Sequence, residues 1–241
     1  MNIIVKKSHK FSKKTRVAKD IKFVIIHYTG MQSTRDSLKR LLSKKTDVSC
    51  HYLIDRKGLI YKMIEESKVA WHAGQSKWKN FNKLNDKSIG IELQNKGHLI
   101  NYENFPKPQI EALIRLLKKL KKKYQIKNHN ILGHSEISPL RKIDPGEKFP
   151  WQILNKKGVS TWFPKFNVNK YTLDKNKVRK IFFKNLYKIG YRYFNLSKKT
   201  SKDTRIIKVF QMRYLPSSVS GKITNKTLQI SQLLVKKSDF T

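Results

Sequence analysis

The chain has 241 residues, enough for one large domain or two small ones, and its 38% apolar and 11% aromatic residues exclude a disordered polymer. The 54 lysine and arginine residues outnumber 16 acidic residues and give a formal net charge of +38. Cys50 has no second cysteine to pair with, so an intramolecular disulfide is excluded, and no apolar run has the length of a membrane span.

The positive charge predicts attraction to polyanions. The lysines are spread along the chain rather than gathered in one arm, which disfavours specific nucleic-acid binding as the main function. Electrostatic attraction to an anionic polymer of a cell envelope fits the same charge.

The first part of the chain predicts a strand, a helix and a hairpin. Residues 1–20 are basic and poorly patterned, and we expect a loosely attached arm. Residues 22–29 form a continuous apolar run, typical of a strand covered on both faces. A capped helix is predicted over residues 33–45, and a hairpin over residues 50–64 with Gly58 in its turn.

Two further strands and a long helix follow. Residues 88–94 and 131–134 have the pattern of short buried strands, and residues 108–124 have apolar side chains at helical spacing. Because strands and helices alternate, we expect an α/β domain over residues 21–155, with helices packed on a central sheet.

The pattern changes after residue 155. Proline and glycine punctuate residues 156–172, which we interpret as a linker. Three short helical patterns without a strand signal follow in residues 173–241, the first capped by Asp174 and ended by Gly190. We expect a small three-helix domain here that folds on its own.

Two histidines and one aspartate form a candidate metal site. His27 ends the first apolar strand, His134 ends the last one, and Asp144 lies in a loop stiffened by neighbouring prolines. Two imidazoles and one carboxylate leave the fourth tetrahedral position of a zinc ion open for water, as in catalytic sites. The ion keeps a net positive charge and lowers the pKa of the water toward about 7. We therefore predict one Zn²⁺ per chain.

Two further residues are candidates for catalysis. Glu92 is the one acidic residue inside an apolar strand, where a carboxylate is costly unless it is paired or used. It is suited to take a proton from water and pass it to a leaving amine. Lys142, two residues before Asp144, is suited to stabilise the oxyanion that forms when water attacks a carbonyl.

These residues lie in motifs whose combination resembles a known family. The motifs are, in chain order, His27-Tyr28-Thr29, Ala70-Trp71-His72-Ala73-Gly74, Ser88-Ile89-Gly90-Ile91-Glu92, Gly133-His134, Arg141-Lys142-Ile143-Asp144-Pro145-Gly146 and Phe149-Pro150-Trp151. Over roughly residues 20–155 the chain resembles the zinc-dependent N-acetylmuramoyl-L-alanine amidases of the type-2 family.

The resemblance implies a mixed sheet flanked by helices, with zinc held by His27, His134 and Asp144. It also implies that Glu92 is the catalytic acid/base and that Lys142 stabilises the transition state. The implied substrate is peptidoglycan or a muropeptide, cut between N-acetylmuramic acid and L-alanine.

Trp71 and His72 are candidates for lining the substrate groove. A place for Trp71 in the hydrophobic core is an equal alternative.

Residues 173–241 are similar to the three-helix peptidoglycan-binding domain that often accompanies such amidases. The similarity rests on Lys208-Val209-Phe210-Gln211 and Gly221-Lys222-Ile223-Thr224, whereas Ser218 and Ser220 replace the acidic residues usual around that turn. A wall-binding domain favours the cell envelope, periplasmic or secreted. The N-terminus has no apolar leader, which leaves the cytoplasm open.

Two rival functions remain at this point. A peptidoglycan recognition protein without catalysis would have lost a zinc ligand, and all three are present here. A polyanion-binding protein would depend on its charge alone, and its affinity would fall steeply with salt.

Overall fold

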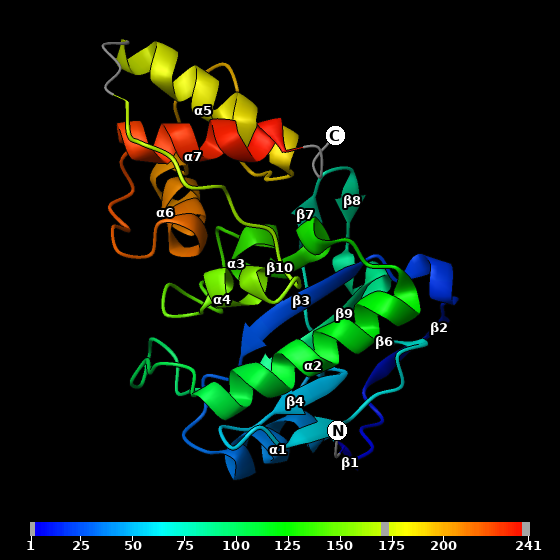
Figure 1. Ribbon diagram of the computed structural model, residues 1–241. Coiled ribbons are helices and arrows are strands. Elements are labelled where there is room, and N and C mark those ends of the chain that lie inside the picture. The colour runs from blue at the N-terminus through cyan, green and yellow to red at the C-terminus, as the bar shows by residue number, and fades with distance from the viewer. Residues whose placement is uncertain (1–2, 170–173, 238–241) are drawn as a thin grey trace.

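A six-stranded sheet forms the centre of the computed structural model, which describes residues 3–169 and 174–237 (Figure 1). Its strands lie in the order β1 (Ile3–Val5), β5 (Ile60–Lys62), β4 (Tyr52–Ile54), β9 (Ser88–Leu93), β3 (Phe23–Tyr28) and β10 (Ile131–Gly133). Strands β4 and β5 pair antiparallel, and the other neighbours pair parallel. The predicted mixed sheet is confirmed.

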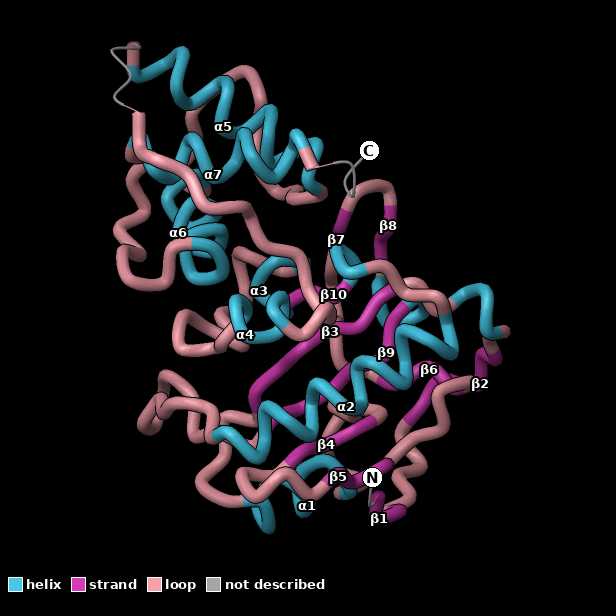
Figure 2. The backbone as a smooth tube through the Cα atoms, in the orientation of Figure 1, coloured by secondary structure: helices cyan, strands magenta, loops and turns pink. Residues whose placement is uncertain are grey.

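Helices and two short ribbons surround this sheet (Figure 2). The helices are α1 (Thr34–Leu42), α2 (Lys107–Tyr124), α3 (His134–Ile137), α4 (Trp151–Lys156), α5 (Lys175–Ile189), α6 (Asp203–Tyr214) and α7 (Asn225–Lys236), with 3₁₀ turns η1 (Ala18–Asp20), η2 (Leu84–Lys87) and η3 (Asn128–Asn130). The ribbons pair β2 (Phe11–Thr15) with β6 (Lys68–Ala70) and β7 (Lys77–Trp78) with β8 (Phe81–Asn82). The three predicted C-terminal helices are confirmed as α5, α6 and α7.

The N-terminal segment is not the loose arm that its composition predicts. Strand β1 pairs with β5, and β2 pairs with β6. The basic side chains also act as buried donors: the Arg16 guanidinium donates to the carbonyls of Glu66 and Ser88 at 3.0 and 2.7 Å, and Lys10 Nζ donates to the Val48 carbonyl at 2.6 Å. A count of charges cannot distinguish such donors from solvated lysines.

Alternation along β3 divides the core between two faces of the sheet. Val24 and Ile26 pack in one hydrophobic cluster with the apolar residues of α2. Phe23 and Ile25 point the other way, into a second cluster that contains the buried side chains of α5, α6 and α7. His27 follows in the same alternation as Phe23 and Ile25, so it belongs to the face of the sheet opposite α2.

The C-terminal helices share a hydrophobic cluster with residues of the sheet, and a domain that folds on its own stays a prediction. The Trp78 ring packs edge-to-face on Tyr191 at 4.9 Å between ring centroids, and the Lys79 amide donates to the Gly190 carbonyl at 2.8 Å. The boundaries of the catalytic domain (21–155), the linker (156–172) and the helical domain (173–241) stay predictions. Residues 170–173, at the expected junction, lie outside the described residues.

No helix within the described ranges has the length and apolar character needed to cross a membrane.

Candidate active site

Three neighbouring parallel strands bring the predicted site residues together at one edge of the sheet. In the pairing of β3 with β9, His27 lies directly opposite Glu92. In the pairing of β3 with β10, Ile26 lies opposite Gly133, which places His134 beside His27 at the ends of their strands. Carboxyl ends of parallel strands are the usual place for a site in an α/β sheet.

The three candidate metal ligands meet in a buried cluster. The Nδ1 atoms of His27 and His134 are 2.9 Å apart, and each lies 3.1 Å from Oδ2 of Asp144. Ligand atoms around a tetrahedral zinc ion are about 3.3 Å apart, given bonds of about 2.0–2.1 Å. The structure therefore brings His27, His134 and Asp144 together as a group that can hold a metal ion.

Hydrogen bonds behind the His27 ring fix which of its nitrogens is free. The Ser88 hydroxyl donates to the Leu84 carbonyl at 2.6 Å, so its oxygen accepts from Nε2–H of His72 at 3.2 Å. Nδ1 of His72 then accepts from Nε2–H of His27 at 3.0 Å. This chain of donors leaves a lone pair on Nδ1 of His27, the nitrogen that faces the cluster.

Nδ1 of His134 is free for the same reason, because Nε2–H of this ring donates to the Ala73 carbonyl at 3.1 Å. Two nitrogen lone pairs and a carboxylate oxygen thus face one another without a proton between the two nitrogens. Acceptors so placed repel one another unless a cation lies among them. The donor set fits zinc, which binds imidazole and carboxylate ligands.

The charges of the cluster follow from burial and from its neighbours. Burial and the nearby His134 ring lower the pKa of His27 to about 4, so this imidazole is neutral at physiological pH. Burial opposes ionisation of Asp144, but the charge and hydrogen bonds that His134 and His27 supply when they are protonated outweigh it and hold the pKa of this carboxyl well below its usual range. Neutral imidazoles and an ionised carboxylate are the forms that bind a metal.

Glu92 lies beside the cluster as a buried carboxyl group. Burial and the charge of Asp144 raise its pKa to about 8, while the charge of Lys142 opposes this shift. Its Oε2 atom is buried and has no hydrogen-bond partner among the protein atoms that the structure describes. A carboxyl group with a pKa near neutrality and a free oxygen is suited to exchange protons with a bound molecule.

The structure places the remaining predicted residues around this centre. Lys142 is half-buried in the loop between α3 and Asp144. Trp71 is 36% exposed, so the core alternative for this residue is wrong. His72 is buried behind His27, where a Cβ on Gly90 would come within 2.4 Å of its ring. A place in the substrate groove stays a prediction for both Trp71 and His72.

The sequence did not indicate the residues that support the ligands from behind. Ser88 orients His72, and Glu136 accepts a hydrogen bond from the Gly133 amide at 2.8 Å, next to His134. Arg205 of α6 donates to the Lys142 carbonyl at 3.0 Å from more than 60 positions further along the chain. The motif Gly133-His134-Ser135-Glu136 contained a signal for Glu136, an acidic residue in a buried segment, but nothing local indicates Arg205.

Comparisons with known proteins agree with this geometry. The model of the N-acetylmuramoyl-L-alanine amidase family matches residues 17–147. The chain is 34% identical over 232 residues to the N-acetylmuramoyl-L-alanine amidase AmiD of Escherichia coli, covering 90% of this chain and 83% of that protein. It is 42% identical over 106 residues to the 1,6-anhydro-N-acetylmuramyl-L-alanine amidase AmpD of Haemophilus influenzae, covering 44% of this chain and 55% of that one.

Solved structures are similar over almost the whole chain. The complex of Escherichia coli AmiD with anhydro-N-acetylmuramic acid-L-Ala-D-γ-Glu-L-Lys has a TM-score of 0.82 at 31% identity and covers 95% of this chain and 94% of that one. AmpDh3 of Pseudomonas aeruginosa has a TM-score of 0.79 at 26% identity, covering 95% and 97%. Since the family model matches more than half of the chain, and AmiD is similar through the C-terminal helices as well, the chain belongs to the N-acetylmuramoyl-L-alanine amidase family.

Proposed function

We propose that the chain is a zinc enzyme that hydrolyses the amide bond between N-acetylmuramic acid and L-alanine in peptidoglycan or its soluble fragments. The observation that carries this proposal is the cluster of His27, His134 and Asp144, whose three acceptor atoms face one another beside the free oxygen of Glu92. The family and the substrate fragment bound by AmiD support the choice of bond.

His27, His134 and Asp144 would hold the zinc ion. Zinc bound there supplies a positive charge that polarises a carbonyl group and lowers the pKa of water. Glu92 accepts a proton from the attacking water and delivers it to the nitrogen of the leaving L-alanine, because its pKa near neutrality permits both transfers. The Lys142 ammonium stabilises the negative charge that develops on the carbonyl oxygen.

The decisive experiment removes one ligand. We expect His134→Ala to lose both zinc, measured by elemental analysis, and hydrolysis of a soluble muramoyl-L-alanine peptide, measured by release of the free peptide amine. A folded His134→Ala variant that retains near-normal turnover would contradict the metal mechanism. A wild-type chain that binds zinc and the peptide without cleaving it would instead favour a recognition protein.

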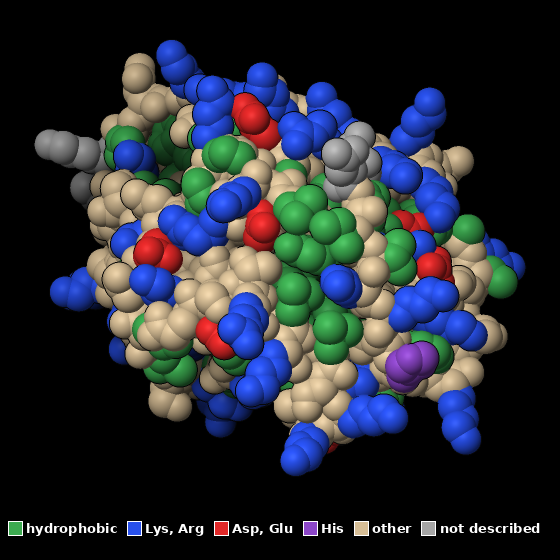
Figure 3. Space-filling model, turned by 90° about the horizontal axis from the view of Figure 1, so that it is seen from below, with side chains coloured by type: hydrophobic (Ala, Val, Ile, Leu, Met, Phe, Trp, Pro, Cys, Tyr) green, Lys and Arg blue, Asp and Glu red, His purple; other side chains and the backbone are tan. Residues whose placement is uncertain are grey.

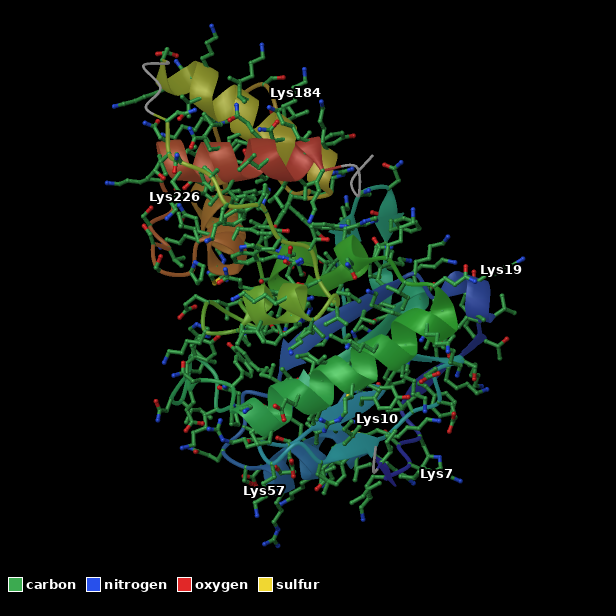
Figure 4. The ribbon with its side chains drawn as sticks, in the orientation of Figure 1. Lys7, Lys10, Lys19, Lys57, Lys184 and Lys226 are labelled. Carbon is green, nitrogen blue, oxygen red and sulfur yellow. The ribbon has the colours of Figure 1, made fainter. Side chains whose placement is uncertain are left out.

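A second proposal concerns the charge of the surface. Lysine and arginine side chains are scattered over the face in Figure 3, with few acidic ones between them. The lysines labelled in Figure 4 come from the region around the sheet and from the C-terminal helices. All of them are exposed except Lys10, which is buried. We propose that this charge attracts the protein to anionic envelope polymers, which predicts weaker retention on insoluble cell wall at high salt.

The charge proposal leads to a test of location. We propose that the protein acts in the cell envelope, because an intact wall and its anionic polymers are found there. Fractionation of the native cell should recover it with periplasmic or secreted proteins. Recovery with the cytoplasmic fraction would favour soluble fragments as the substrate.

A further inference from the structure

Glu136 is a buried acidic residue that the chemistry above does not use, although it lies two positions from the ligand His134. Its Oε2 accepts a hydrogen bond from the Gly133 amide at 2.8 Å, so this side chain holds the turn from which the His134 ring projects. The Ser135 amide, two positions further on, donates to the Asp144 carbonyl at 2.8 Å. The turn held by Glu136 therefore links two of the three ligands.

Two further partners of Glu136 come from the C-terminal region, one on α6 and one in the segment after α5. NH1 of Arg213, on α6, donates to Oε2 of Glu136 at 2.5 Å, and the Tyr191 hydroxyl donates to Oε1 at 2.9 Å. The same Arg213 nitrogen donates to the Ile131 carbonyl on β10 at 3.1 Å. Both side chains of the Glu136–Arg213 pair are 2% exposed. One arginine of α6 thus ties together the strand before His134 and the turn after it.

A second arginine of α6 bonds to the loop that contains Lys142. Arg205 donates from Nε to the Pro139 carbonyl at 2.9 Å and from NH2 to the Lys142 carbonyl at 3.0 Å. These carbonyls bracket the loop that carries Lys142 toward the metal cluster. If α6 only packed against the sheet region, its arginines could bond anywhere on that surface. Instead, Arg205 and Arg213 both donate to backbone carbonyls of the segments that carry His134 and Lys142.

We propose that α6 is part of the catalytic apparatus: Arg213 positions His134 through Glu136, and Arg205 positions Lys142 through its carbonyl. The role of the C-terminal helices is then to hold the site in its working geometry, whether or not they also bind glycan. This inference rests on the proposed function for its activity measurements, but its zinc measurements stand without it.

Arg205 gives the sharper test, because its half-buried guanidinium can be removed without leaving a buried charge unpaired. We expect Arg205→Met in the full chain to lower kcat on a soluble muramoyl-L-alanine peptide on the order of 10-fold to 100-fold, with KM little changed, because misplacing a catalytic group by about 1 Å has such effects. Arg205→Lys should recover part of the loss.

The matched control is Arg179, which also donates to backbone carbonyls, those of Asn195 and Lys198. It pairs with the Asp203 carboxylate at the start of α6 at 2.6 Å and touches only the helical region. We expect Arg179→Met to lower the melting temperature and to leave kcat unchanged. Equal kcat values for Arg205→Met and Arg179→Met, in folded proteins, would overturn the role of Arg205.

For Arg213, the measurement is zinc affinity in competition with a chelator, well below the melting temperature. Loss of a residue that orients a ligand typically costs about 10-fold to 100-fold in metal affinity. We expect a weakening of this size in Arg213→Met, partly recovered in Arg213→Lys, and none in Arg179→Met. Wild-type affinity in Arg213→Met would overturn the role of Arg213.

Two outcomes need separate interpretation. If Arg213→Met does not fold, the zinc affinity of Arg213→Lys and the kcat of Arg205→Met decide the inference. If the wild-type chain binds zinc but hydrolyses no muropeptide, the proposed function fails, while the zinc affinities of the Arg213 and Arg179 variants still test whether α6 holds the ligand.

Discussion

Glu92 and the metal ligands occupy neighbouring positions in the sheet but have different tasks. Glu92 projects from β9, whereas the ligand set of His27, His134 and Asp144 is complete without it. We therefore expect Glu92→Gln to retain zinc and to lose about two to four orders of magnitude in kcat, the usual contribution of a general acid/base. Elemental analysis and peptide release measure the two effects. Loss of zinc in this variant would show that Glu92 is a ligand.

The raised pKa of Glu92 also predicts how stability changes with pH in metal-free protein. The carboxyl has a pKa of about 8 in the folded chain and about 4.3 in an unfolded one. Between these values the folded state holds a proton that the unfolded state has lost, so stability falls as pH rises through this window.

Glutamine removes this titration. We expect the melting temperature of metal-free Glu92→Gln, relative to metal-free wild type, to be higher at pH 9 than at pH 5. Thermal melts by circular dichroism at the two pH values measure the difference. An equal difference at both values would mean that the carboxyl ionises as freely in the folded chain as in water.

His72 is expected to act on the metal through His27. Its Nδ1 atom is the acceptor for Nε2–H of His27, and phenylalanine keeps the ring but removes this acceptor. We expect His72→Phe to weaken zinc binding about 10-fold to 100-fold. His9→Phe, at an exposed position, serves as the control. Unchanged zinc affinity in a folded His72→Phe variant would contradict a role of His72 in orienting His27. Only the predicted place of His72 in the substrate groove would then remain.

At the scale of elements, apolar patterning predicted most strands of the central sheet and the long helix α2, and it missed the short ribbons. The strand around Phe23–Tyr28, the hairpin at Gly58, and α2 were predicted because apolar residues repeat over enough positions. Strands β6, β7 and β8 have two or three residues each and show no period. The pattern of β3 also indicated burial on both faces, but not that its two faces belong to different hydrophobic clusters.

The metal ligands could be predicted from the sequence more easily than the residues that hold them in position. Zinc chemistry restricts the residue types, so His27, His134 and Asp144 could be chosen from the sequence. Arginines such as Arg205 and Arg213 cannot be singled out in a chain with 54 basic residues, because their partners are backbone carbonyls or distant side chains.

The C-terminal helices provide a prediction about elements as a group. Without α5, α6 and α7, Trp78 would lose its cover, and the buried Glu136 would lose Arg213 and Tyr191. An uncompensated buried charge and an uncovered core face are both strongly destabilising. We expect a chain ending at residue 169 to melt at a much lower temperature and to retain less zinc.

Thermal melts and elemental analysis of the truncated chain test this expectation. A truncated chain with wild-type stability and zinc content would instead support the separate domain that the sequence predicted.

At the scale of the whole molecule, a strongly basic surface surrounds a site whose working groups are nearly all buried. Positive charge raises the local concentration of an anionic polymer but does not select a bond. Selection of the bond depends on the metal cluster, Glu92 and Lys142. High salt should therefore weaken retention on cell wall while leaving hydrolysis of small soluble fragments largely intact.

The most direct test of the central claim is hydrolysis of a 1,6-anhydro-N-acetylmuramyl peptide by protein stripped of metal with a chelator and then restored with zinc, with the products identified by mass spectrometry. We expect the stripped protein to be inactive, and the restored protein to release the intact peptide with a free L-alanine amine. Full activity in the stripped protein, or cleavage at any other bond, would contradict the account.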